Sequence, residues 1–142
     1  MTKPLTYEEA GVNRAANVAA NEQAKHWAEQ TRTNKIVTPP GMFSAGYDLS
    51  HVVEKHKQPE FFLGMHSLPE GVDRTTESLE QAAESLTNTM TQTLIERGIE
   101  PLFLSNYIAF GELDDDLVGA AVKGVHNVAK TLGIDLSGGE TA

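Results

Sequence analysis

Two short stretches of this chain carry residues of the kinds that bind phosphate groups. The first is a double glycine near the C-terminus, Gly138 and Gly139, followed by Glu140 and Thr141. Glycines allow backbone N–H groups to approach an anion closely, because no side chain intervenes. Glu140 would then hold a cation or a ribose hydroxyl beside that anion. This stretch is typical of the start of a nucleotide-binding loop.

The second stretch is EGVDRT, which runs from Glu70 to Thr75. A nucleotide-binding role for Glu70, Gly71 and Arg74 is implied only by the family resemblance given below. The same residues, which follow Pro69, also fit an ordinary turn that leads into a helix. The sequence leaves both interpretations open.

The other charged clusters do not predict a metal site. Asp114, Asp115 and Asp116 are consecutive, and acids at a helix start are typical caps that also suit the helix dipole. The five histidines show no i, i+4 spacing of the kind that binds zinc. We therefore expect no metal ligands and no catalytic residues among these groups.

Composition limits the class of protein. The chain has 142 residues, no cysteine and a net charge of −9. This length fits one domain, residues 1–142, with one hydrophobic core. The acidic balance argues against nucleic acid as a partner, because such a surface needs a basic stripe. No leader or membrane-spanning run is recognisable, so we expect a cytoplasmic protein with no membrane partner.

Apolar periodicity and chain breakers predict the secondary structure. The strongest helix is Thr75 to Arg97, in which apolar residues recur every three or four positions before Gly98. The remaining predicted elements are listed here in chain order: a weakly amphipathic helix within Tyr7 to Gln30, a strand within Met42 to Ser50, a strand at Phe61 to Met65, a strand at Leu102 to Phe110, a helix from Asp114 to Gly133, and a short strand at Ile134 to Ser137.

This order predicts an α+β (mixed α/β) fold, a four-stranded sheet with helices on one face. The other face would expose apolar side chains, and patches of that size usually mark an interface. The pattern therefore predicts a homodimer through the sheet. Because side chains alternate along a strand, either Phe103 or Leu104 must point toward the partner.

The stretch from Gly98 to Ala142 resembles aminoimidazole ribonucleotide synthetase, the PurM enzyme of purine synthesis, also called phosphoribosylformylglycinamidine cyclo-ligase. GIEPLFLSNYIAFGELDDDL and GIDLSGGETA match that family's G-A-E-P-L-F-F-L-D-Y and G-G-E-T-A motifs, and LTYEEAGVN at Leu5 to Asn13 resembles its start. The resemblance implies a PurM N-terminal-like domain that dimerises through its sheet into a shared barrel. It also implies that a C-terminal domain would follow.

The resemblance further implies chemistry that uses ATP and Mg²⁺, but this chain departs from the family at the relevant motifs. The family's V-N-D falls on Thr91, Gln92 and Thr93, which carry no charge and are poor magnesium ligands. Its D-G-V-G-T-K motif can be laid on Glu70 to Thr75 only with an insertion. The nucleotide-binding residues that remain are Glu70, Gly71, Arg74, Gly138, Gly139, Glu140 and Thr141.

Three functions remain open from the sequence. The first is a non-catalytic binding and dimerisation module without a cofactor, which pairs with itself, with a full-length purine enzyme or with a nucleotide. The second is a fragment or divergent form of an active synthetase that uses ATP and Mg²⁺ to close the imidazole ring. The third is an unrelated scaffold that captures a purine enzyme.

Overall fold

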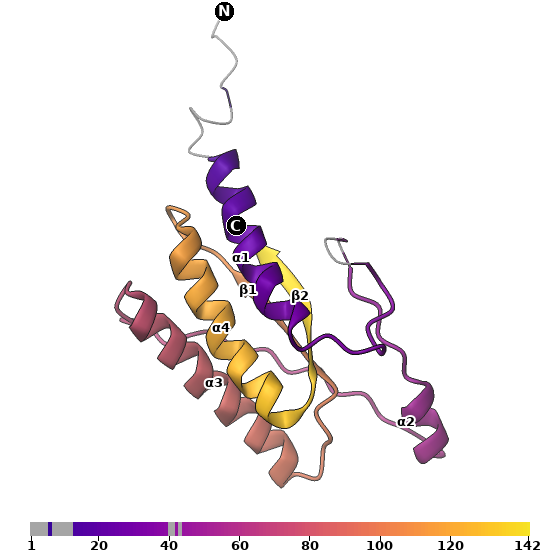
Figure 1. Ribbon diagram of the computed structural model, residues 1–142. Coiled ribbons are helices and arrows are strands. Elements are labelled where there is room, and N and C mark those ends of the chain that lie inside the picture. The colour runs from indigo at the N-terminus through magenta and orange to yellow at the C-terminus, as the bar shows by residue number, and fades with distance from the viewer. Residues whose placement is uncertain (1–5, 7–12, 40–41, 43) are drawn as a thin grey trace, which may run out of the picture.

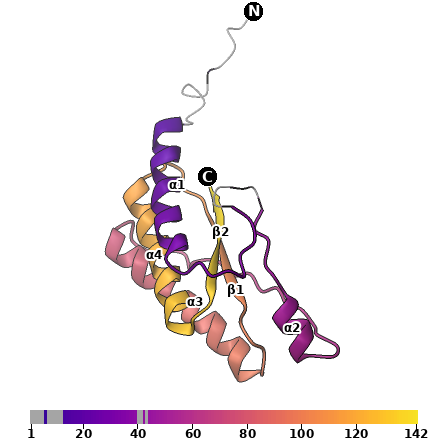
Figure 2. The same cartoon turned by 45° about the vertical axis from the view of Figure 1, so that its right-hand side comes forward.

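The computed structural model describes Thr6, residues 13–39, Met42 and residues 44–142, which form four helices and two strands. Three long helices lie on one side of the strands (Figure 1). They are α1 (Arg14–Glu29), α3 (Thr76–Glu96) and α4 (Asp115–Leu132). The short helix α2 (Ser50–Lys55) stands apart from this layer (Figure 2). Among these helices, none is both long and apolar enough to cross a membrane.

Side-chain caps fix where the long helices begin. The Asn13 carboxamide oxygen accepts from the N–H groups of Ala15 and Ala16, each at 3.1 Å. Thr75 caps α3 in the same way, and Asp114 Oδ1 accepts from Leu117 N at 3.1 Å to cap α4. Each cap satisfies a backbone donor that the first helical turn leaves free. The capping interpretation of Asp114 is therefore confirmed.

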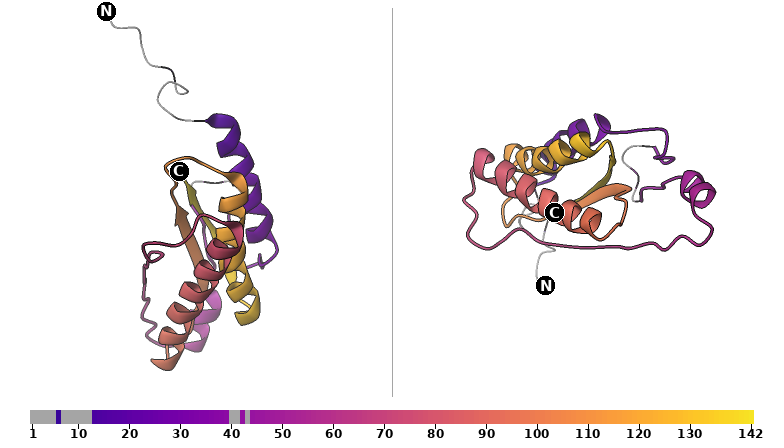
Figure 3. Two further views of the ribbon diagram at one scale, coloured as in Figure 1. Left: turned by 90° about the vertical axis from the view of Figure 1, so that its left-hand side faces the viewer. Right: turned by 90° about the horizontal axis from the view of Figure 1, so that it is seen from below.

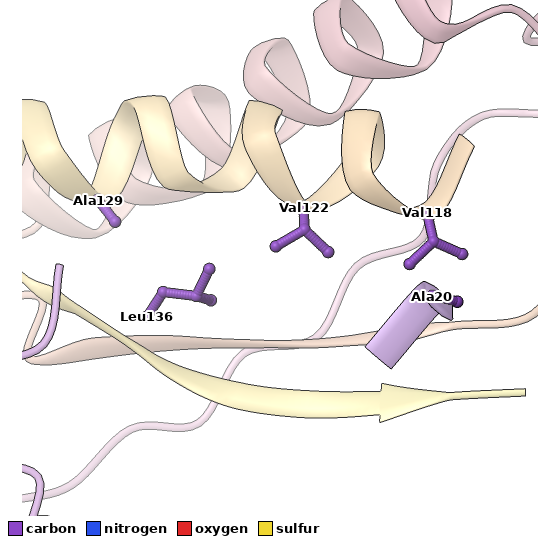
Figure 4. Packing of buried hydrophobic residues seen from close by; sticks show 5 residues of the cluster. All are labelled: Ala20, Val118, Val122, Ala129 and Leu136. Atoms are coloured by element: carbon purple, nitrogen blue, oxygen red, sulfur yellow. The ribbon is translucent and has the colours of Figure 1, made fainter. Parts of the chain in front are cut away.

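Helix α4 is the centre of the fold, between α3 and α1 and above the strands (Figure 4). Its side chains Val118, Val122 and Ala129 are at most 1% exposed and point toward Ala20 and Leu136. The helix ends at Gly133, whose positive φ of 67° allows Ile134 N to reach back to Ala129 O at 3.0 Å. This turn directs the chain straight into the second strand.

The sheet is smaller than the sequence predicted. In the described residues it consists of two parallel strands, β1 (Phe103–Ile108) and β2 (Asp135–Thr141), joined through α4. Parallel strands need such a crossover, and a helix usually provides it. The α+β class is confirmed, but the prediction of four strands is wrong for this part of the chain.

The two missing strands have different outcomes. Between Met42 and Ser50, the described residues contribute only an isolated antiparallel bridge from Tyr47 to Ile36. The Asp48 carboxylate then accepts from Ser50 N and Oγ, at 2.8 and 2.6 Å, and so turns the chain into α2. Residues 61–65 are extended but pair with no strand, and they cross the side of β1 that faces away from α4 (Figure 3).

Helix α1 is described only from Arg14, after its cap. The earlier part of the helix predicted within Tyr7 to Gln30 lies outside the described residues, as does most of the family-like start at Leu5 to Asn13.

Candidate functional site at the carboxyl end of the strands

The double glycine lies within strand β2 and does not form a loop. Gly139, Glu140 and Thr141 pair in register with Asn106, Tyr107 and Ile108 of β1. The predicted nucleotide loop at these residues is therefore wrong as a description of the backbone. The last strand was expected to end at Ser137, but it continues to Thr141.

The strand ladder itself explains the two glycines. A Cβ on Gly139 would lie 2.1 Å from the Asn106 carbonyl oxygen, so only glycine allows β1 and β2 to approach here. Gly138 has a φ of +125°, a conformation that side chains rarely adopt. It lies in a bulge, because the register shifts by one residue between Leu104 and Asn106. Ser105 Oγ closes the bulge by donating to Gly138 O at 3.0 Å.

Glu140 and Thr141 point to opposite faces of the sheet. Thr141 is 6% exposed and lies opposite Ile108, which packs against the helical core. Glu140 lies opposite Tyr107, which is 70% exposed on the face without helices. Of the two predicted nucleotide-binding side chains, only Glu140 is accessible to a ligand.

Arg74 reaches the end of the same strand pair. Its guanidinium carbon lies 5.5 Å from the centre of the Phe110 ring, and its Nη2 donates to Glu112 O at 3.2 Å. Phe110 N in turn donates to Ala142 O at 2.9 Å, just beyond β2. The two predicted clusters therefore meet at one segment, at the carboxyl end of the strands. In open α/β sheets, this is the edge where ligands bind.

Glu70 and Gly71 form an exposed turn before this edge, with a φ of +81° at Gly71. The prediction of an ordinary turn at these residues is therefore confirmed for the backbone. Phe110 and Glu112, which position Arg74, were not singled out from the sequence. Their only signal was the Phe-Gly-Glu segment after a strand, which resembles many turns.

The charges at this edge do not fit a triphosphate. Arg74 is the cation that reaches Phe110 and Glu112, while Glu140 and the acids of the Glu112–Asp116 segment are close in the chain to the same strand ends. Asp114 already occupies one of the free N–H groups of α4. In the described residues, this edge included, no three histidine or acidic side chains gather as a metal site would require. One cation among several acids is a poor match to the negative charge of a triphosphate.

The residues aligned with the family's V-N-D motif lie at the other end of the fold. They occupy the last two turns of α3, which leads to the amino end of β1. Thr91 is 1% exposed and donates to Thr87 O at 2.9 Å, while Thr93 donates to Thr89 O at 2.8 Å. Gln92 lines a groove of about 450 Å³ between α3 and α4. Both threonine hydroxyls are therefore used within their own helix.

This arrangement is an α+β domain with a parallel β–α–β unit, one helical face and one open sheet face. The sequence model of the family described as AIR synthase related protein, N-terminal domain, matches residues 50–142. The chain belongs to this family, and the resemblance seen in the sequence is confirmed.

Individual relatives support the same assignment over nearly the whole chain. A phosphoribosylformylglycinamidine cyclo-ligase of Polaromonas sp. is 31% identical over 99% of this chain. Enzymes of the same name from Albidiferax ferrireducens and Leptospira interrogans are 32% and 28% identical, over 98% and 100% of this chain. The match covers 40–42% of the length of these relatives. The chain therefore spans about two fifths of the enzymes that it resembles.

Proposed function

We propose that this chain is a non-catalytic binding and dimerisation module of purine nucleotide biosynthesis. It would act by pairing with a second copy or with a full-length relative. The observation that carries the proposal is the exposed apolar segment Phe61–Met65 on the open sheet face. In this segment Phe62, Leu63 and Met65 are 56%, 77% and 85% exposed.

The open face continues from this segment onto β1. Phe61 stacks on Phe103 with ring centres 6.3 Å apart, and Tyr47 contacts the same ring at 5.0 Å. Tyr107 lies further along β1 on the same face. Leu104 instead packs against the core, so Phe103 is the one of the two that faces outward. A contiguous apolar patch on a domain surface favours an interface.

The backbone of the patch supports the same interpretation. Residues 60–68 are extended, and in the described part of the chain they make no ladder with β1 or β2. The helices cover one face of the two-stranded sheet, and the other face has no helix over it. A partner that covers the face would bury both the apolar side chains and these free backbone groups.

The positions that catalysis would need support a module without catalytic activity of its own. Thr91, Gln92 and Thr93 supply no carboxylate for a magnesium ion, and the carboxyl edge offers Arg74 against several acids. Without metal ligands, the charge that develops during phosphoryl transfer is left uncompensated, at a cost of several kcal/mol. We expect that the pure chain will not convert formylglycinamidine ribonucleotide.

Sedimentation velocity across the micromolar range tests the pairing. We expect a dimer whose interface buries more than about 1,000 Å² in total. Phe62→Glu should shift the equilibrium to monomer, because it places a charge inside that interface. Val18→Glu is the matched control, since Val18 is 64% exposed on α1, away from the open face. A monomeric wild-type chain, or equal dissociation by both variants, would refute the pairing.

A second candidate is a fragment or divergent form of an active cyclo-ligase that uses ATP and Mg²⁺. It is favoured by 31–32% identity to the Polaromonas and Albidiferax cyclo-ligases along nearly the whole chain. Calorimetric titration with Mg²⁺-ATP separates the candidates. Micromolar affinity that is lost in Glu140→Ala would favour the second one. Absence of binding heat with either protein would support the first.

A further inference from the structure

A cavity of about 240 Å³ lies at the amino ends of the two strands, opposite the candidate site. Four polar side chains line it: Lys35, Tyr47, His51 and Glu100. They come from the bridge before α2, from α2 itself and from the segment between α3 and β1. Because these residues are far apart in the chain, no sequence pattern predicted that they would share a site.

Apolar side chains form the rest of the wall. Ile95 comes from the end of α3, and Leu132 and Ile134 flank the turn at Gly133 that ends α4. In the last turn of α4, the Gly133 and Ile134 N–H groups bond to the carbonyls of Lys130 and Ala129. The negative pole of the helix is therefore partly satisfied by its own backbone.

The polar groups of the cavity differ in whether they already have partners. The Glu100 carboxylate pairs with Lys55 Nζ at 2.6 Å, and this hydrogen bond lowers the pKa of Glu100. The Tyr47 hydroxyl donates to Leu102 O at 3.1 Å. Burial, then Asp135 and Glu100, raise the pKa of Tyr47, so its hydroxyl stays protonated.

Lys35 is the exception among these groups. Its ammonium has no carboxylate within 4.0 Å among the residues that the structure describes, although the side chain is half-buried. Glu100 is paired with Lys55, and the buried Asp135 carboxylate, which also acts on Tyr47, accepts from Thr33. Among the described residues that line the cavity, Lys35 is therefore the charged group without an ion-pair partner. A cation beside apolar walls matches a ligand with one negative group and an apolar body.

We propose that this cavity binds small monocarboxylates with a compact apolar ring or chain, the carboxylate at Lys35 and the apolar part against Ile95, Leu132 and Ile134. The ring of His51 also lines the cavity and can donate an N–H to the carboxylate, whereas the Tyr47 hydroxyl proton is already donated to Leu102 O. The volume is slightly below the range of about 300–1,000 Å³ usual for ligand pockets. It therefore suits a single ring and excludes nucleotides.

Nuclear magnetic resonance of the 142-residue chain tests this site, with sodium benzoate as the probe at constant ionic strength. We expect saturable shifts of the backbone amides of Lys35, Tyr47 and Gly133. Lys35→Met keeps the methylene stem and removes the charge, and it should weaken benzoate about tenfold or more. Lys25→Met is the matched control, since Lys25 is a surface lysine of α1 and should leave benzoate affinity unchanged.

The neutral isostere benzamide gives a comparison that needs no variant. It should bind the wild-type chain about tenfold more weakly than benzoate, because it lacks the charge that faces Lys35. Shifts that rise linearly without saturation would overturn the proposal. Equal affinity of benzoate for Lys35→Met, or of benzamide for the wild-type chain, would also overturn it. Tyr47 also contacts Phe103 of the open sheet face, so the amides of Lys35 and Gly133 are the reporters that separate benzoate binding from dimerisation.

Discussion

Replacing Gly124 with alanine tests the closest helix contact in the fold. Gly124 lies in α4, where α3 crosses it, and an added Cβ would lie 2.3 Å from Glu80 O and 2.8 Å from Glu84 N. Both neighbouring atoms belong to the backbone of α3, so no side chain can rotate away. Carbon contacts are optimal near 3.5–4.0 Å, so the two helices would have to separate by roughly 1 Å.

Two effects of opposite sign decide the free energy of unfolding of Gly124→Ala. Alanine favours the helix by about 1 kcal/mol over glycine. Overpacking in a tight core costs about 1–3 kcal/mol, and a backbone clash belongs at the upper end. We therefore expect a net loss of about 2 kcal/mol, or a Tm lower by about 6 °C for a chain of this size.

Gly119→Ala is the matched control in the same helix. An added Cβ there would lie 3.3 Å from both Cβ and Oε1 of Gln23, a tight contact that a shift of a few tenths of an ångström relieves. We expect this variant to be unchanged or more stable by up to about 1 kcal/mol, from helix propensity alone. Urea unfolding followed by circular dichroism measures both variants. If Gly124→Ala were as stable as Gly119→Ala, the packing of α3 on α4 described here would be wrong.

Three further substitutions test individual hydrogen bonds. Asp135→Ala should lower the free energy of unfolding by about 2–4 kcal/mol, because the 1%-exposed carboxylate accepts from Thr33 N and from Thr33 Oγ1 at 2.8 Å. Thermal melts at neutral pH would measure the loss, and a smaller loss would contradict these hydrogen bonds. Asp114→Ala should cost about 1 kcal/mol through the lost α4 cap, whereas an unchanged urea midpoint would show that the cap is dispensable. The pKa of Tyr47 is raised in the folded chain. Its contribution to the free energy of unfolding is therefore complete below the ordinary pKa of tyrosine and is lost as pH rises through the pKa of the folded state. Stability should therefore fall in alkaline solution, and Tyr47→Phe should flatten that fall while it loses about 1 kcal/mol at pH 7 with the bond to Leu102; an unchanged alkaline slope would refute the assignment.

The long helices and the first strand could be predicted from the sequence because their signals are local. Helix α3 was expected from Thr75 to Arg97 and occupies Thr76–Glu96, and α4 follows Asp114 and ends before Gly133 as expected. Caps and apolar periodicity both report on the residues of one element. Strand β1, expected within Leu102 to Phe110, occupies Phe103–Ile108.

The strands that were wrongly predicted depend on partners that a local pattern does not contain. Phe61–Met65 has an apolar composition typical of a buried strand, yet its side chains are largely exposed and it pairs with no strand. The double glycine was interpreted as a nucleotide-binding loop because glycines allow backbone N–H groups to approach an anion closely. Only the position of Asn106, more than thirty residues earlier in the chain, shows that Gly139 is needed for close strand approach.

The candidate site was predictable in part for the same reason. Arg74 and Glu140 were both singled out, and the structure brings their segments to one edge of the sheet. The contact that positions Arg74 uses the ring of Phe110, and no spacing rule predicts it. The cavity at the opposite edge was not foreseen, since Lys35, Glu100 and Ile134 come from separate elements.

The glycines of this chain and the neutral residues at the family's metal-binding positions support different conclusions about its role. Gly124 and Gly139 are fixed by backbone atoms that lie within 2.3 Å of an added Cβ, so the close approaches of α3 to α4 and of β1 to β2 are built into the sequence. The positions where the family resemblance implies metal-binding groups instead carry Gln92 and Thr93. A domain that keeps its demanding packing but supplies neutral groups for chemistry can still present an intact surface. The exposed Phe61–Met65 segment on that surface is why we favour association over catalysis.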